Sequence, residues 1–361
     1  MSTVRVNLGE RSYEIDIRAG NLARVGAVVA SLARGTCVAV VTDANVAVLY
    51  ADAVTQSLDA AGLVSRVFEV PAGEASKSPT TLAGLWQDFI AFDMDRTSTV
   101  VALGGGVVGD LAGFAAATTM RGVRYVQVPT TLLACVDSSV GGKTAIDLAA
   151  GKNLVGAFHQ PSAVVIDPTT LCTLPKRELV AGLAEVIKHG VIMDAAFFER
   201  LERDIDKLLA LDAEVTAEII ARNCELKAGV VAEDEREAGR RAILNYGHTV
   251  GHAVETLSGG ARVHGEAVAV GMAVEAVIAE KLGRIGSEVT ERQNALLERA
   301  GLPTTVGDVK TAEALETMRH DKKAKQGRLN FALPSAIGSC DVVADVRPET
   351  VVEALEACRD G

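Results

Sequence analysis

Three of the six histidines in this chain of 361 residues lie close together in the sequence. His248 and His252 are spaced i,i+4, which on a helix would place both imidazoles on one face, where they could bind one metal ion. A zinc protease would carry a glutamate directly after the first histidine, and Thr249 stands there instead. The alternative set combines His248 and His264 with a distant carboxylate and gives His252 another role. Spacing does not choose between these sets, but a cluster in a histidine-poor chain favours a functional site over core packing.

A glycine-rich loop over Gly104–Asp110 reads GGGVVGD and follows an apolar segment. It matches the G-x-G-x-x-G pattern, in which bare backbone and a helix N-terminus accommodate the pyrophosphate of a dinucleotide. The acidic residue expected about 20 positions later to bind the ribose is absent, and Arg121 and Arg124 lie in that region. We therefore expect Asp43, at the end of the first predicted strand, to bind the ribose. The alternative is a tight turn that binds no ligand.

A second loop gathers polar residues among glycines. Gly142-Lys143-Thr144 is similar to the end of a phosphate-binding P-loop, but that motif needs a glycine where Asp137 stands. Asp137, Lys143, Lys152 and Asn153 together suit an anionic, hydroxylated ligand. The alternative is an ordinary polar surface loop.

The elements that must position these residues follow from periodicity. Apolar, mainly β-branched segments at residues 37–42, 65–70, 99–103, 125–128 and 163–166 alternate with helical segments, which predicts a parallel sheet covered by helices. After Leu174-Pro175 the predicted segments are mainly helical: 176–189, 195–209, 213–232, 247–257, 265–282 and 290–300. We therefore predict an α/β, Rossmann-like parallel-sheet domain over residues 1–174, which binds the dinucleotide. A mostly α-helical domain over residues 175–361 would bind metal and substrate.

Composition limits the classes of partner. The net charge of −11 and the scattered basic residues argue against a nucleic-acid partner. Six cysteines without a C-x-x-C pair indicate a reduced, cytoplasmic protein, and no signal peptide is evident at the N-terminus. No apolar run reaches the roughly 18 residues of a membrane helix, so we expect no membrane partner.

Longer stretches resemble the 3-dehydroquinate synthase family of sugar-phosphate cyclases. They are GGGVVGDLAGFAA, RGVRYVQVPTTLLACVDSSVGGKTAID, GKNLVGAFHQP, GLAEVIKHG, LNYGHTVGHAVE, HGEAVAVGM and DKK, in family order. The resemblance implies a two-domain enzyme with NAD and one divalent metal, zinc or cobalt. It also implies that Glu185, His248 and His264 bind the metal and that His252 contacts substrate, in place of the i,i+4 metal pair.

The resemblance also implies the other contacts. The dinucleotide would contact Asp43, Asn45, Glu74, Lys77, Gly105, Gly106, Val107, Gly109, Asp110, Thr130, Thr131, Lys143, Lys152, Thr170, Leu171, Cys172 and Thr173. The substrate and its reaction would involve Arg121, Asp137, Lys143, Asn153, Lys188, Lys227, Arg241, Asn245, His252 and one of Lys322 and Lys323.

The implied reaction converts 3-deoxy-D-arabino-heptulosonate 7-phosphate, an anionic sugar phosphate, into 3-dehydroquinate and phosphate in the shikimate pathway. Its steps are transient oxidation by NAD, phosphate elimination, re-reduction, ring opening and aldol closure. Alternatives are an amino-dehydroquinate synthase or another sugar-phosphate cyclase, although Lys227, Arg241, Asn245 and His252 match the dehydroquinate pattern. A metal- and NAD-dependent polyol dehydrogenase ranks lower, and a non-catalytic binding protein lowest. The resemblance further implies a homodimer, with Arg121 reaching the partner's site.

Overall fold

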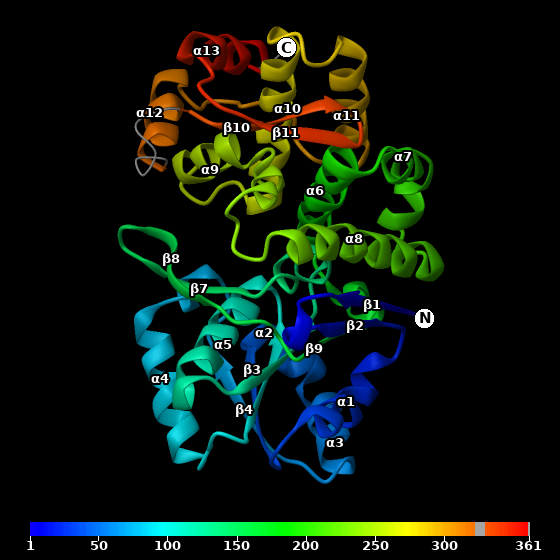
Figure 1. The fold of residues 1–361 in the computed structure, drawn as a ribbon, viewed down its shortest axis with the longest axis vertical. Helices are drawn as coiled ribbons and strands as arrows, with labels where there is room; N and C mark the ends of the chain where they lie inside the picture. The colour runs from blue at the N-terminus through cyan, green and yellow to red at the C-terminus, as the bar shows by residue number, and fades with distance from the viewer. Residues whose placement is uncertain (322–328, 360–361) are drawn as a thin grey trace. The chain divides into compact units, whose positions relative to one another are not determined.

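The computed structural model describes residues 1–321 and 329–359, which form two compact units (Figure 1). The first unit contains residues 1–174 and 216–232, and the second contains residues 175–215 and 233–361. We describe each unit by itself.

The first unit is built on a sheet of seven strands in the order β1-β2-β9-β6-β5-β3-β4. Only the edge strand β1 is antiparallel to its neighbour. The strands are β1 (Ser2–Val6), β2 (Tyr13–Ile17), β3 (Cys37–Asp43), β4 (Val64–Val70), β5 (Thr99–Gly104), β6 (Arg124–Pro129) and β9 (Ala163–Ile166). The helices within residues 1–174 are α1 (Val25–Leu32), α2 (Ala44–Val46), α3 (Asp52–Ala60), α4 (Pro79–Ala91) and α5 (Gly106–Thr118).

Helices cover both faces of this sheet because its central strands are apolar on both sides. Successive side chains of a strand point to opposite faces, so Ala39 and Val41 of β3 pack with α4 and α5, whereas Val38 and Val40 pack with α1 and α3. The predicted α/β domain with a parallel sheet is confirmed, and all five predicted strands are present, as β3, β4, β5, β6 and β9.

The strand order puts the candidate cofactor residues at one edge of the sheet. The parallel strands β3, β4, β5, β6 and β9 follow the doubly wound order 2-1-3-4-5, which reverses direction between β3 and β5. Ligands of such sheets bind outside the carboxyl ends of the strands at this reversal. Asp43 ends β3 and Gly104 ends β5, so the two sequence motifs lie on either side of it.

Four strands of the first unit were missing from our prediction. β1 and β2 form a hairpin that extends the sheet, and the alternation in YEIDI was the signal for β2. β7 (Lys143–Leu148) and β8 (Gly151–Phe158) form a separate hairpin from the loop that we read as polar and irregular. Its many glycines and polar residues concealed the strands.

The second unit is mainly helical, as predicted. Its helices are α6 (Lys176–Met193), α7 (Ala195–Leu209), α9 (His248–Leu257), α10 (His264–Lys281), α11 (Ser287–Arg299), α12 (Thr311–Asp321) and α13 (Pro348–Ala357). A hairpin of β10 (Phe331–Ala336) and β11 (Ser339–Val343) completes the unit. α10 is apolar nearly all round and runs through the core, where α9, α12, α13 and β10 pack.

Glycines allow three of these helices to approach closely. A Cβ atom added at Gly265 of α10 would lie 2.0 Å from the carbonyl oxygen of Ala181 in α6. One added at Gly271 would lie 1.8 Å from the carbonyl oxygen of Gly247, directly before α9. Because real Cβ atoms do not approach so closely, α6, α9 and α10 make backbone contacts that only glycine permits.

α8 (Ala213–Glu233) crosses the unit boundary. We predicted it in the second domain, but residues 216–232 group with the first unit. The reason is that its buried face contacts residues of that unit: Cys224 Sγ lies 3.3 Å from the carbonyl oxygen of Cys135, and Lys227 bonds Asp137. Within residues 1–321 and 329–359, no helix is both long and apolar enough to cross a bilayer.

We predict that Gly271→Ala destabilises the protein by roughly 3 kcal/mol, because the new methyl group overlaps backbone that has nowhere to move. Urea unfolding followed by circular dichroism measures the change. Gly84→Ala on α4 is the control: nothing lies within 4 Å of its added Cβ, so it should be neutral or stabilise by up to about 1 kcal/mol. Equal stabilities for the two variants would show that the α9–α10 contact is not tight.

Candidate active site

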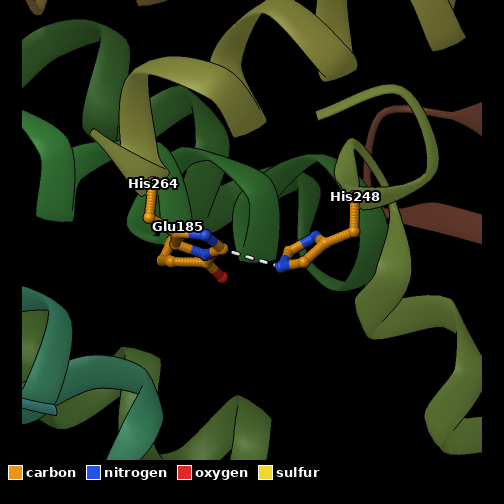
Figure 2. Close-up of side chains that lie close together, drawn as sticks. All are labelled: Glu185, His248 and His264. Atoms are coloured by element: carbon orange, nitrogen blue, oxygen red, sulfur yellow. Dashed lines mark ion pairs between the residues drawn. The ribbon is translucent and has the colours of Figure 1, made fainter. Parts of the chain in front are cut away.

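Three helices of the second unit bring together Glu185, His248 and His264 (Figure 2). Glu185 lies in the middle of α6, whereas the two histidines are the first residues of α9 and α10. The side chains point toward one another, and one ligand atom from each lies within 4.8 Å of the others. Residues far apart in the sequence therefore form one compact donor set.

The spacing of these atoms suits a metal ion. Nε2 of His248 and Nε2 of His264 lie 3.6 Å and 3.8 Å from Oε1 of Glu185. Tetrahedral zinc with bonds of about 2.1 Å places its ligand atoms about 3.4 Å apart. Glu185 is 1% exposed, and Oε1 accepts no hydrogen bond among the described residues. A buried carboxylate oxygen without a donor is costly, and a cation at this point would satisfy it.

Neighbouring groups orient both imidazoles. Nδ1 of His248 lies 3.1 Å from the carbonyl oxygen of Tyr246, and Nδ1 of His264 lies 3.3 Å from Oε2 of Glu255. Because these oxygens only accept hydrogen bonds, each Nδ1 carries a proton, and in the neutral imidazole each Nε2 offers a lone pair to the shared point.

Charge distinguishes the two histidines. Burial and the nearby ammonium of Lys188 lower the pKa of His248 well below its usual value, so it is neutral, the form that binds metals. Burial also lowers the pKa of His264, but its pairing with the carboxylates of Glu185 and Glu255 outweighs burial and raises this pKa to about 9. The carboxylates thus attract a positive charge to this position, either a proton or a metal ion.

Two other candidate residues adjoin this donor set. The ammonium of Lys188 pairs with Oε2 of Glu185 and is buried with it. His252 is exposed, and its ring centroid lies 5.3 Å from that of His248 and 6.2 Å from that of His264. The i,i+4 histidines therefore do share one side of α9, but the carboxylate faces His248 and His264.

In the first unit, the glycine loop joins β5 to α5 as a close turn. A Cβ atom added at Gly109 would lie 2.7 Å from Oε1 of Gln127 in β6, so this glycine lets the helix pack on the sheet. Gly105 precedes α5 and offers no side chain to cap it. The first N–H groups of α5 are thus suited to the phosphate oxygens of a ligand.

The predicted ribose residue and its neighbours lie at the same ends of the strands. Oδ1 of Asp43 accepts hydrogen bonds from the backbone N–H groups of Asn45 and Val46 at 2.9 Å and 3.1 Å. The N–H of Thr130, after β6, donates to the carbonyl oxygen of Gly104 at 3.0 Å. Val107 is the second residue of α5, and Thr170, Leu171, Cys172 and Thr173 belong to a short 3-10 helix over Pro168–Thr173, after β9.

A polar cluster links the glycine-loop helix to the β7–β8 hairpin. Nζ of Lys77 donates to Oδ2 of Asp110 in α5 at 2.8 Å and to Oδ1 of Asn153 in β8 at 2.5 Å. Glu74 lies 3.8 Å from the ammonium groups of both Lys77 and Lys152. One buried lysine therefore joins predicted cofactor residues to a predicted substrate residue.

The remaining candidates fall in both units. In the first, Nζ of Lys227 donates to Oδ1 and to the carbonyl oxygen of Asp137 at 2.5 Å and 2.7 Å. Lys143 begins β7 and is exposed, and Arg121 follows α5 in a left-handed conformation, with φ 67°. In the second, Arg241 and Asn245 lie on a short 3-10 helix. Lys322 and Lys323 lie outside the described residues.

Our reading of the residues missed two carboxylates. Glu255 orients His264, and Glu275 of α10 accepts hydrogen bonds from the N–H groups of Gly247 and Val250 at the start of α9. Glu255 ends the stretch LNYGHTVGHAVE and sits seven residues after His248, on the same side of a helix, which was a usable signal. The sequence held no comparable signal for Glu275, because only the packing of α10 brings it to α9.

Comparison with known proteins gives matches along most of the chain. The profile described as 3-dehydroquinate synthase N-terminal matches residues 67–181, and the one described as 3-dehydroquinate synthase C-terminal matches residues 182–324. A 3-dehydroquinate synthase of Desulforamulus reducens is 50% identical over 359 residues, which cover 98% of this chain and 99% of the relative.

Two solved structures share the fold over nearly the whole length. A 2-deoxy-scyllo-inosose synthase in complex with carbaglucose-6-phosphate, NAD+ and Co2+ superposes with a TM-score of 0.88 at 26% identity, covering 99% of this chain and 100% of its own. A 2-epi-5-epi-valiolone synthase from Streptomyces hygroscopicus subsp. jinggangensis with NAD+ and Zn2+ gives a TM-score of 0.89 at 28% identity, with 98% of both chains covered.

We predict that Glu185→Gln reduces bound zinc to below about a tenth of the wild-type content, because a neutral amide replaces the charged ligand. Metal content after equilibrium dialysis measures this loss. His252→Ala is the matched control and should retain its zinc. Loss of zinc from His252→Ala but not from His264→Ala would instead support the i,i+4 metal pair.

A second prediction concerns Asp110. Burial raises its pKa to about 6, and the charge of Lys77 opposes this rise. Between about pH 4 and pH 6 the folded chain therefore binds more protons at Asp110 than the unfolded chain, and this group lowers stability as the pH rises. Lys77→Met removes the opposing charge, so the loss of stability should extend above pH 6.

Urea midpoints measured from about pH 5 to about pH 8 test this second prediction. The control is the double variant Lys77→Met/Asp110→Asn, which has no titrating group at position 110. Parallel midpoints for the single and double variants across this range would contradict the prediction.

Proposed function

The chain belongs to the 3-dehydroquinate synthase family, and we propose that it converts 3-deoxy-D-arabino-heptulosonate 7-phosphate into 3-dehydroquinate and phosphate. The observation that carries this proposal is the full-length likeness to 3-dehydroquinate synthases, together with the donor set of Glu185, His248 and His264. NAD and one divalent metal, zinc or cobalt, are its cofactors, in keeping with the NAD+ and Zn2+ or Co2+ of the two solved relatives.

The metal would be held by Oε1 of Glu185 and by Nε2 of His248 and of His264. Two imidazoles and one carboxylate are a ligand set of catalytic zinc sites, which leave a further position open for substrate. When bound, the metal supplies a Lewis acid and NAD supplies a reversible hydride acceptor. Lys188 would remain on Oε2 of Glu185, where its ammonium faces the same buried carboxylate.

The dinucleotide would lie along the carboxyl ends of the strands in the first unit. The N-terminus of α5 would bind its pyrophosphate, and Asp43 would accept hydrogen bonds from a ribose. This placement explains why no acidic residue follows the glycine loop at the usual interval. Thr130 and Thr131 after β6, with the short helix over Pro168–Thr173, would complete this side of the site.

Cationic side chains would bind the anionic groups of the substrate. We assign this role to Arg121, Lys143, Lys227 and Arg241, because lysine and arginine suit phosphate and carboxylate oxygens. Such cationic side chains would let a protein of net charge −11 bind a sugar phosphate. His252 has an exposed imidazole next to the donor set, and it would exchange protons with substrate hydroxyls.

We also propose that the protein is a cytoplasmic homodimer. All six cysteines lie within the described residues and are free thiols, which suits a reducing compartment. Trp86, Ile90 and Met120 expose apolar surface in the first unit, beside Arg121. A second copy of the chain would cover this surface and come near that arginine.

We predict that the heptulosonate phosphate yields phosphate without accumulation of NADH, because hydride taken from the substrate is returned to it. Simultaneous assays of phosphate and of NADH absorbance, with zinc and NAD supplied, test this outcome. Glu185→Gln should reduce phosphate release by at least about 100-fold. Steady accumulation of NADH on a simple polyol, without phosphate release from the heptulosonate, would favour a polyol dehydrogenase instead.

A further inference from the structure

A buried carboxylate from α10 caps the helix that begins with the ligand His248. Glu275 is completely buried, and its two oxygens accept hydrogen bonds from different N–H groups at the start of α9. Oε2 accepts from Gly247 at 2.7 Å, and Oε1 accepts from Val250 at 3.1 Å. Gly247 has no side chain with which to cap the helix itself and adopts a left-handed conformation, with φ 79°. A residue 28 positions away in the sequence thus takes the place of a local cap.

Stability alone is a weak reason for a charge at this place. Burial of a carboxylate costs several kcal/mol, whereas a neutral Ser, Thr or Asn is the usual cap for an N–H such as that of Val250 and buries no charge in the core. Buried charges are better explained where they fix one arrangement of neighbouring groups. The group that this carboxylate fixes is the backbone on either side of His248.

The residues next to His248 are held at several points. The hydroxyl of Tyr246 donates to the carbonyl oxygen of Met272 at 3.1 Å and to Oε1 of Gln293 at 2.5 Å. The carbonyl oxygen of Tyr246 in turn faces Nδ1 of His248. With Gly247 and Val250 bound by Glu275, the backbone before and after His248 is tied to α10, which also carries His264.

Electrostatics gives Glu275 a second effect on a bound cation. α9 begins at His248, so the positive end of its dipole lies at the residue that would bind the metal. A divalent cation close to that end is repelled, and a carboxylate on the same N–H groups offsets the repulsion. At α10, Oε2 of Glu266 likewise accepts a hydrogen bond from the N–H of Val263 at 3.2 Å, but both oxygens of this carboxylate also pair with the guanidinium of Arg177.

We propose that Glu275 is a positioning residue for metal binding: it holds His248 in the orientation that meets Glu185 and His264, and it offsets the dipole of α9. It touches neither substrate nor metal and acts through the backbone of Gly247 and Val250. This inference rests on the metal site of the proposed function.

The test compares zinc affinity with stability. In Glu275→Gln the amide nitrogen cannot accept a hydrogen bond and the charge is gone, so we expect the zinc Kd to rise about 10- to 100-fold. Glu275→Asp keeps the charge but is shorter, and a smaller increase is expected. Kd values come from competition with a chromophoric chelator, and the absorption spectrum of the cobalt-loaded protein reports the ligand geometry.

Asp194→Ala is the matched control. Asp194 caps α7 in the same unit by accepting a hydrogen bond from the N–H of Phe197 at 3.0 Å, and it belongs to neither α9 nor α10. It should lower the melting temperature but leave the zinc Kd and the cobalt spectrum unchanged. Equal zinc affinity in wild type, Glu275→Gln and Asp194→Ala would overturn the proposal, as would equal weakening in both variants. Failure of the wild type to bind zinc would instead overturn the proposed metal site.

A measurement on the unaltered chain covers the case in which the Glu275 variants do not fold. Zinc should slow hydrogen exchange of the Gly247 and Val250 amides at least about 10-fold, because a bound ligand locks the capped backbone. The Phe197 amide, capped by Asp194, should change by less than about 2-fold. Equal effects at the three amides would contradict a specific link between Glu275 and the metal site.

Discussion

The backbone contact among α6, α9 and α10 determines where the donor atoms of the metal site lie. A Cβ atom at Gly265 would meet the backbone of α6, and one at Gly271 would meet the residue before α9. Because no side chains separate them, three short donor side chains from three helices reach one point. A larger helix separation, as ordinary side chains at the contacts would impose, would leave these residues too far apart for one ion.

This close packing places positive charge around the donor set, and neighbouring carboxylates offset it. Two helices begin at His248 and His264, so both positive dipole ends and the ammonium of Lys188 surround the donor set. Glu185, Glu255 and Glu275 supply negative charge around it. The site thus attracts a cation although it is built from helix N-termini, which by themselves favour anions. In the first unit, the uncapped N-terminus of α5 follows that ordinary preference and suits a phosphate.

Much of the fold followed from local patterns in the sequence, and the failures have identifiable causes. Buried parallel strands such as β3 and β9 are short, apolar and bounded by helices, so their periodicity was readable. The β7–β8 hairpin was not, because its residues are mostly exposed and half of them are polar or glycine. Spacing alone left two metal sets open, and only the family resemblance favoured Glu185 with His264. The contact of Glu275 with α9 depends on helix packing and could not be read from spacing at all.

In the first unit, a buried charge also links two elements: Lys77 is buried and is paired with acidic side chains. Lys77 bonds Asp110 on the glycine-loop helix and Asn153 on the β7–β8 hairpin, so a shift of either element would leave its ammonium poorly paired. Because an unpaired buried charge is costly, the two elements are expected to move together. A cofactor bound at α5 would therefore also steady the hairpin that carries Lys143 and Asn153. The proposed reaction must return its hydride to the same substrate. The link through Lys77 would keep the substrate-binding and cofactor-binding residues at a fixed distance until re-reduction is complete.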